Sequence, residues 1–345
     1  MNLIIVLLAA LLITILLTPL CRGVAISLRI VDYPNERKVH RVPTPLLGGV
    51  SIFISFVLIL AFTGLLKNKA VLSIIAGATI ISVFAVYDDA KRITAASRLL
   101  SQIVASFVII RSGIVFTFMP NTAWGKIIEI ILTVIWILGI TNGLNYLDGL
   151  DCLAGGLVVV SSFGFLGVAL LTNQSVLQIC AVALAGATIG FLPFNCKKRI
   201  FLGDMSSTLG FILAAVAIMG TWAEYSLIDL TIPILILGIP VFDMIFTTIS
   251  RIYTGKIKSA VQWMEYAGLD HFHHRLLNLG LSPDSVVVFI WATNVVLCAS
   301  ALVLWGTRNY HSVLMPLLLV FQAVIVFILI SVLMVFGKHK KIKIK

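Results

Sequence analysis

The chain has 345 residues, of which 60% are hydrophobic and only 11% are charged. Its mean hydropathy of +1.11 excludes a soluble globular domain. The net charge of +11 does not indicate nucleic-acid binding, because the basic residues lie in short loops and a Lys-rich tail, where membrane topology and anionic lipids favour them. The composition predicts an all-α, polytopic integral membrane protein.

Eleven hydrophobic segments approach the length of about 20 residues that a helix needs to cross a bilayer. In chain order we predict spans at 3–20, 46–66, 70–87, 97–118, 126–142, 153–172, 175–194, 205–223, 228–250, 286–306 and 312–336. No polar insert is long enough for a core of its own, so residues 1–345 form one membrane-embedded domain. Its functional loops are expected at 21–45, 88–98, 142–152, 195–204 and 251–285, followed by a basic tail at 337–345.

The basic residues predict the orientation of these spans. All but five of the 25 Lys and Arg residues fall in alternate loops and in the tail. Cytoplasmic loops carry the excess of Lys and Arg in membrane proteins. We therefore predict an outside N-terminus, a cytoplasmic C-terminus and a cytoplasmic position for every acidic motif, and the odd number of spans agrees with this.

The cysteines give no sign of a disulfide framework or of a zinc site. They are scattered within or beside the predicted spans and lack Cys-x-x-Cys spacing. We expect all five to be reduced or to serve as core residues: Cys21, Cys152, Cys180, Cys196 and Cys298.

The first acidic motif is the pair Asp88 and Asp89 at the end of the third predicted span. Adjacent carboxylates repel one another, so at least one needs a proton or a cation nearby. Lys91 and Arg92 are candidate partners. Taken alone, the pair is more simply interpreted as a solvated helix end.

The second motif runs from Thr141 to Asp151. Asn142, Asn145 and Asp148 recur every three residues and Asp151 continues the series, so helical turns would bring them to a common side. Oxygen ligands from Asn and Asp suit Mg²⁺. The alternative is that Asn145 and Asp148 cap the next helix, and the loop alone does not decide between the two.

The third motif, Phe201-Leu202-Gly203-Asp204, precedes the eighth span. The backbone N–H groups and hydroxyls that follow it are suited to receive a phosphate. Asp204 as the N-cap of that span is a second interpretation, and the two are compatible.

The fourth motif is Asp270-His271-Phe272-His273-His274-Arg275 in the long loop. Arg275 is a candidate for binding a diphosphate through paired N–H donors. A transition-metal site is less favoured, because no cysteine accompanies the histidines. Asp243, within the ninth span, is an intramembrane acid that would pair with a cation such as Arg251.

Capping explains each motif taken alone, but four motifs on one side of the membrane indicate an active site for phosphate transfer. An ion-coupled transporter is the main alternative, although its acids would lie near the bilayer midplane. A CDP-alcohol phosphatidyltransferase is less favoured, because Leu150-Asp151-Cys152 lacks the Ala-Arg pair that its pattern requires.

Together with Arg37-Lys38-Val39-His40 and with Pro43-Thr44-Pro45-Leu46-Leu47-Gly48-Gly49, these motifs resemble the polyprenyl-phosphate N-acetylhexosamine-1-phosphate transferases. That group lies in glycosyltransferase family 4 and is distantly related to phospho-MurNAc-pentapeptide translocase. The resemblance covers nearly the whole chain. It implies a Mg²⁺-dependent transfer of a sugar 1-phosphate, with GlcNAc favoured, from a UDP-N-acetyl sugar to undecaprenyl phosphate. The resemblance further implies that UMP is released at the cytoplasmic face of the bacterial inner membrane.

The resemblance also implies roles for individual residues. Asn145 and Asp204 match the metal ligands, with Mn²⁺ as a substitute ion, and Asp88 matches the residue that deprotonates the lipid phosphate, supported by Asp89. Asp148 and Asp151 match acids near the nucleotide. The substrate-binding positions are Lys38, Asn142, Gly149, Leu150, Asn195, Phe201, His271, His273, His274 and Arg275, with Phe201 expected to stack on uracil.

Three departures from the family pattern leave these ligands in place. Cys152 replaces a usual Gly, Met205-Ser206 replaces a small residue and Gly, and Lys197-Lys198 replaces a common Pro-Ala. The favoured mechanism is direct in-line attack by the lipid phosphate, and a covalent Asp intermediate is the alternative. The oligomeric state stays open, a homodimer included.

Overall fold

The computed structural model describes residues 2–34, 42–220, 230–258, 262–263, 266, 268–307 and 314–336. Within these ranges the chain is almost entirely helical. The only strands described are β1 (Val31–Asp32) and β2 (Thr44–Pro45), which pair antiparallel. The predicted all-α class is therefore confirmed.

The helices follow the predicted spans in order. They are α1 (Leu3–Ser27), α2 (Gly48–Phe62), the 3-10 turn η1 (Leu65–Lys67), α3 (Lys69–Lys91), α4 (Ala95–Ile110), α5 (Ala123–Leu147), α6 (Leu153–Leu171), α7 (Ser175–Asn195), α8 (Met205–Met219), α9 (Thr231–Ile236), α10 (Gly238–Tyr253), α12 (Phe272–Asn278), α13 (Pro283–Thr307) and α14 (Leu314–Phe336).

Six of these helices are long and apolar enough to cross a membrane: α1, α3, α5, α6, α7 and most of α13. Shorter apolar helices, including α2, α4 and α8, accompany them. Backbone groups in lipid must be satisfied within each segment, which a helix achieves by itself. The chain is therefore a multi-pass membrane protein, while the number of eleven spans and their orientation stay predictions.

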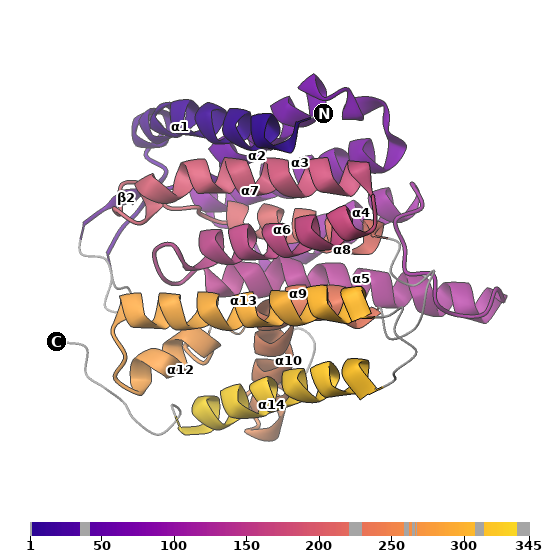
Figure 1. Cartoon of the computed structure of the whole chain (residues 1–345). Coiled ribbons are helices and arrows are strands. Elements are labelled where there is room, and N and C mark those ends of the chain that lie inside the picture. The colour runs from indigo at the N-terminus through magenta and orange to yellow at the C-terminus, as the bar shows by residue number, and fades with distance from the viewer. Residues whose placement is uncertain are drawn as a thin grey trace.

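The long helices lie side by side in one bundle, and α10 stands across them between α13 and α14 (Figure 1). The start of α1 and the end of α14 lie at opposite ends of this bundle. β2 and α12 lie at the same end as the end of α14. The acidic motifs belong to the connections at this end.

Several helices extend further than predicted, so the expected loops 21–45, 88–98 and 142–152 are shorter. α1 continues to Ser27, α3 to Lys91 and α5 to Leu147. Hydropathy locates only the part of a helix that lies in hydrocarbon, whereas backbone hydrogen bonding continues into the polar region. The acidic side chains are consequently held on helix ends rather than on free loops.

The predicted ninth span, 228–250, is broken into α9 and α10 at Leu237. Pro240 has no N–H to donate to the carbonyl of Ile236, which a continuous helix would require. Ser161 on α6 donates its hydroxyl to that carbonyl instead, at 3.1 Å. The break allows α10 to stand across the bundle (Figure 1).

α1 and α7 approach through two glycines of α7. Gly186 and Gly190 lie four residues apart, so they share one helix face. A Cβ at Gly186 would lie 2.4 Å from the carbonyl oxygen of Leu7, and one at Gly190 would lie 2.4 Å from that of Leu11. Small residues at this spacing allow close backbone contact between membrane helices.

We predict that Gly190→Ala destabilises the protein, because the added methyl would meet a backbone atom that cannot turn aside. The expected loss is about 1–3 kcal/mol in the free energy of unfolding. Gly139→Ala on α5 is the matched control, since no atom lies within 4 Å of its added Cβ. Thermal unfolding in detergent should show a lower Tm for Gly190→Ala than for the wild type, and an unchanged Tm for Gly139→Ala. Equal Tm values for the two variants would contradict the close contact between α1 and α7.

Candidate active site

Most of the predicted site residues line one large cavity of about 620 Å³ at the functional end of the bundle. The α5–α6 and α7–α8 connections and the first turns of α13 form its walls. The predicted residues that line it are Asp89, Asn145, Asp148, Gly149, Leu150, Asp151, Asn195, Phe201, Asp204 and His274.

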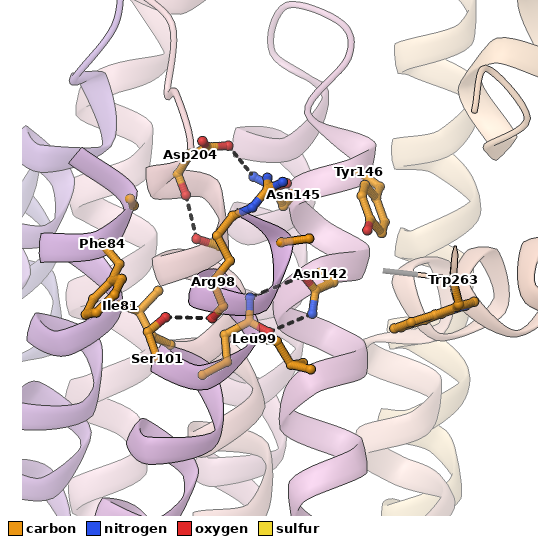
Figure 2. Close-up of a pocket in the computed structure, with 14 residues that line it drawn as sticks. Ile81, Phe84, Arg98, Leu99, Ser101, Asn142, Asn145, Tyr146, Asp204 and Trp263 are labelled. Atoms are coloured by element: carbon orange, nitrogen blue, oxygen red, sulfur yellow. Dashed lines mark hydrogen bonds between the residues drawn. The ribbon is translucent and has the colours of Figure 1, made fainter. Parts of the chain in front are cut away.

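A second, smaller cavity of about 40 Å³ lies against α4 and α5 (Figure 2). Apolar side chains including Phe84, Leu99 and Trp263 line it together with Arg98. Asn145 and Asp204 line both cavities. These two side chains therefore form the wall at which the cavities meet.

Asn145 and Asp204 are in direct contact. The amide of Asn145 donates to Oδ1 of Asp204 at 3.2 Å and to Oγ of Ser206 at 3.0 Å. Asp204 occupies the N-cap position of α8, but its side chain makes no capping hydrogen bond. α6 has Cys152 at its N-cap, so Asn145 and Asp148 do not cap that helix. The capping interpretation is therefore wrong for Asn145 and Asp148, whereas Asp204 does hold the N-cap position of α8, with its side chain turned to the cavities instead of to the helix backbone.

Gly203 allows Asp89 to hold the backbone before Asp204. The N–H of Asp204 donates to both carboxylate oxygens of Asp89, at 3.1 and 3.2 Å. Gly203 has a φ of +68°, in the left-handed region that favours glycine, and its added Cβ would lie within 2.3 Å of Asp89. The Gly-Asp motif therefore joins α3 to the start of α8.

The cation that pairs with Asp88 is Arg98, and the expected partners Lys91 and Arg92 are wrong. Nε of Arg98 lies 3.3 Å from Oδ2 of Asp88, whose Oδ1 accepts from the N–H of Ile93 at 2.8 Å. Lys91 instead lies over the ring of Tyr87. The short turn between α3 and α4 brings Arg98 back to the end of α3.

Arg98 is a site residue that the sequence analysis missed, because it was counted only as a topological charge. A usable signal was the short polar turn ending at Thr94, whose hydroxyl accepts from the N–H of Ser97 and caps α4. A helix that starts this soon after Asp88 must place its first turn beside that residue.

The wall between the cavities holds crowded carboxylates. Burial, followed by the charge of Asp88, raises the pKa of Asp204 to about 6. Burial, followed by the charges of Asp204, Asp151 and Asp89, raises the pKa of Asp148 well above its ordinary value. Each acid disfavours ionisation of its neighbours, so the site as a whole favours a bound cation.

The donor set suits a hard cation such as Mg²⁺. Oδ2 of Asp88 is buried and accepts no hydrogen bond, and Asp204 and Asn145 supply further oxygen atoms beside it. Among the described residues, no three His, Cys, Asp or Glu side chains form a metal site by themselves. An ion here would therefore need the amide oxygen of Asn145.

Asp243 anchors the histidine motif rather than pairing with Arg251, which corrects the expectation. Oδ2 of Asp243 lies 2.6 Å from Nδ1 of His271, and Oδ1 accepts from the N–H of Phe272 at 2.7 Å. Arg251 makes a two-point contact with Asp270 at 3.1 and 2.6 Å. Burial raises the pKa of Asp270, but Arg251 outweighs it and lowers that pKa overall.

Of the four predicted residues in this motif, only His274 lines the large cavity. His273 is fully buried, with its ring against Gly149. Arg275 donates to the carbonyls of Met334 at 2.7 Å and Asp270 at 2.6 Å, so it links α12 to α14. Burial, followed by neighbouring histidines, lowers the pKa of His273 and lowers that of His274 to about 4, so both are neutral.

The remaining predicted residues have varied surroundings. Oδ1 of Asn195 accepts from the N–H of Cys152 at 2.8 Å, and its amide donates to the carbonyl of Ile200 at 3.2 Å. Asn142 on α5 pairs with Gln102 on α4 and lines the smaller cavity. Lys38 lies outside the described residues.

Cys152 and Cys196 form a disulfide, so the expectation that all cysteines are reduced is wrong. The two residues are 44 apart in sequence, but the fold brings their Cα atoms to 5.2 Å. Cys152 has a φ of +68°, in the left-handed region that favours glycine. An ion pair of 3.5 Å between Lys198 and Asp151 joins the same two connections.

The first turns of α13 supply a wall that the sequence analysis did not single out. Asp284, Val287, Val288 and Trp291 recur at helical spacing and line the large cavity. Trp291 is fixed by donating its ring N–H to the carbonyl of Leu153 at 3.2 Å. In sequence this stripe has the same pattern as a lipid-facing one, so no signal distinguished it.

The fold and the site define a multi-pass membrane protein with a buried carboxylate and amide cluster at one end of its bundle. The model of glycosyl transferase family 4 matches residues 71–221. The protein named probable undecaprenyl-phosphate N-acetylglucosaminyl 1-phosphate transferase, from Bacillus subtilis, is 32% identical over 92% of this chain and 89% of its own length. The chain belongs to this glycosyl transferase family.

Two further relatives carry similar names. The decaprenyl-phosphate N-acetylglucosaminephosphotransferase of Mycobacterium leprae is 28% identical over 89% of this chain and 85% of its own. The undecaprenyl-phosphate alpha-N-acetylglucosaminyl 1-phosphate transferase of Yersinia pestis is 26% identical over 78% and 75% respectively. The predicted resemblance is thus confirmed.

We predict that Cys152 and Cys196 resist alkylation. Protein denatured in the presence of an alkylating reagent, without reductant, should carry the label on Cys21, Cys180 and Cys298 only, because sulfur atoms in a disulfide do not react. Mass spectrometry of the peptides measures this, and added reductant should expose the remaining two. Labelling of all five cysteines before reduction would contradict the disulfide.

Proposed function

We propose that this chain transfers N-acetylhexosamine 1-phosphate, with GlcNAc as the favoured sugar, from a UDP-sugar to undecaprenyl phosphate. UMP is the second product, and the lipid-linked sugar starts a cell-envelope glycan. The reaction takes place at the cytoplasmic face of the bacterial inner membrane. The observation that carries the proposal is the meeting of two chemically different cavities at Asn145 and Asp204. The names of the relatives support the same reaction.

The larger cavity is suited to the nucleotide sugar. Its volume of about 620 Å³ lies within the range of pockets that bind molecules of this size. Phe201 on its wall offers an aromatic face for uracil, and Trp291 and Leu150 add apolar surface. In this proposal the diphosphate extends toward Asp204.

The smaller cavity is suited to the lipid phosphate. It combines a cation, Arg98, with apolar side chains such as Phe84 and Leu99, which matches a phosphate attached to a hydrocarbon chain. At about 40 Å³ it has room near the phosphate only, so the polyprenyl chain would continue along the apolar surface of the bundle. Arg98 would bind the phosphate in place of Asp88.

We propose that Mg²⁺, with Mn²⁺ as a substitute, is held by Asn145 and Asp204. When bound, the ion supplies positive charge that offsets the repulsion between the two phosphorylated substrates. The crowded carboxylates of the wall and the oxygen atoms that Asn145 and Asp204 bring to both cavities fit such an ion.

The chain's own residues then provide the base and the alignment. Asp88, freed from Arg98 by the incoming phosphate, takes the proton of the lipid phosphate. An oxygen of that phosphate attacks the phosphorus attached to the sugar, and the bond to the departing UMP breaks in line with it. Holding both phosphates at one wall provides the positioning on which phosphoryl transfer mainly depends.

The test is release of labelled UMP by purified protein in detergent, from UDP-GlcNAc, with and without undecaprenyl phosphate and Mg²⁺. We expect release only when both are present, and a loss of about 10²–10³-fold in Asp204→Asn, because that change removes a carboxylate proposed to hold the ion that offsets the charge of the reacting phosphates. Release from a different UDP-N-acetyl sugar would keep the reaction and change the donor. The absence of UMP release with every UDP-sugar would contradict the proposal and favour the ion-coupled transporter.

The lipid-free arm of this assay also separates direct attack from the covalent route. With UDP-sugar labelled in its sugar phosphate, direct attack leaves the protein without label. Label found on Asp88 or Asp89 would require a covalent intermediate and would exclude direct attack.

We further predict that Arg98→Ala lowers kcat/KM for undecaprenyl phosphate about tenfold or more, because the smaller cavity loses its cation. Lys91→Ala is the matched control, since Lys91 is a nearby cation that contacts the exposed face of Tyr87 instead. Initial rates at varied lipid concentration measure the effect. An equal loss in both variants would show that general positive charge, rather than Arg98, is what matters.

A further inference from the structure

A reciprocal pair of amides joins α4 to α5 beside the site. The side-chain amide of Asn142 donates to Oε1 of Gln102 at 2.7 Å, and that of Gln102 donates back to Oδ1 of Asn142 at 3.2 Å. In the described part of the chain these are the two hydrogen bonds that join α4 to α5. Gln102 is buried, and Asn142 also donates to the carbonyl of Leu138 at 2.8 Å.

The pair lies one helical turn away from the proposed reaction centre on both helices. Arg98 precedes Gln102 by four residues on α4, and Asn145 follows Asn142 by three on α5, so each couple shares a helix face. Figure 2 shows Arg98 and Asn142 on facing helices, with Asn145 and Asp204 at the next level. Fixing Gln102 against Asn142 therefore fixes the level of Arg98 relative to Asn145.

We propose that Gln102 is a positioning residue for the lipid phosphate. It sets the register of α4 against α5, so that Arg98 stays beside Asp88 and opposite Asn145. This inference rests on the proposed function. The described residues of α4 and α5 make no other side-chain hydrogen bond to one another, and two facing amides satisfy all their bonds in one register only. A shift of α4 would leave a buried amide without its partner, which costs free energy.

The two substrates should respond differently to loss of this pair. α4 contributes Ala95, Arg98, Leu99, Ser101 and Gln102 to the smaller cavity. None of the described α4 residues lines the large cavity. A displaced α4 therefore disturbs the lipid phosphate and leaves the nucleotide site intact.

The experiment compares Gln102→Leu with the double variant in which Gln102→Asn and Asn142→Gln exchange the two amides. Gln102→Leu should lower kcat/KM for undecaprenyl phosphate about tenfold, which corresponds to the loss of one coupled contact. Equilibrium binding of labelled UDP-GlcNAc with Mg²⁺ should change by less than about twofold. The exchange should restore most of the rate, because the amide pair reforms with the same combined length.

Gln178→Leu is the matched control for a purely structural role. Gln178 on α7 also makes an amide contact between helices, donating to the carbonyl of Ala169 at 2.9 Å, but it lines neither cavity. Its loss should alter Tm without altering kcat/KM for the lipid.

Three results would overturn the inference: an unchanged lipid kcat/KM in Gln102→Leu, an equal loss for both substrates, or no rescue by the exchange in a folded double variant. A wild-type protein without transfer would instead refute the proposed function itself.

Discussion

The mutual repulsion of buried carboxylates is the constraint on which the rest of this structure depends. Asp88, Asp89, Asp148 and Asp204 come from three separate helix ends, and they are gathered at one end of the bundle. Such a group cannot be fully ionised in a poorly solvated site without compensating positive charge. Arg98 supplies part of it at Asp88. The negative charge that Arg98 does not compensate is the physical reason to expect a divalent cation at the site, together with phosphorylated substrates that bind it.

The fold holds these acids together by fixing connections rather than by burying a large polar core. Asp89 binds the backbone before α8, and Asn195 at the end of α7 joins the N-cap of α6 to Ile200 in the α7–α8 connection. The disulfide of Cys152 also links the start of α6 to the end of α7. The break between α9 and α10 brings Asp243 to the histidine motif, which it anchors at two points. Each link acts where a helix ends, so rigid membrane helices determine the geometry of the site.

The pattern of hydrophobic and charged residues predicted the helical class, the order of the helices and the gathering of the acids. It could do so because the membrane itself sets the length of the apolar segments and the side on which basic residues lie. The contact of Asn145 with Asp204 followed from the family resemblance, since no periodicity relates residues 59 positions apart. The partner of Asp243 was missed because it comes from a distant segment, and the partner of Asp88 because Arg98 was counted only as a topological charge. The sequence analysis assigned nearby basic residues as the partners of these two acids, whereas the helix packing places Arg98 beside Asp88 and His271 beside Asp243.

Other misses had equally local causes. The disulfide joins two cysteines whose proximity arises only when α6 and α7 pack together. The histidine motif was expected to face substrate throughout, yet three of its four predicted residues lie behind the cavity wall, where they hold α12 in place. A polar motif in sequence does not distinguish side chains that touch a ligand from those that support the ones that do.

The most direct measurement is a structure of the protein with Mn²⁺, UDP and undecaprenyl phosphate, a combination that cannot react because UDP carries no sugar. The account predicts the uracil beside Phe201 in the large cavity and the lipid phosphate beside Arg98 in the smaller one, with the ion between them at Asn145 and Asp204. Both phosphorylated molecules in a single cavity, or an ion bound away from that wall, would contradict it.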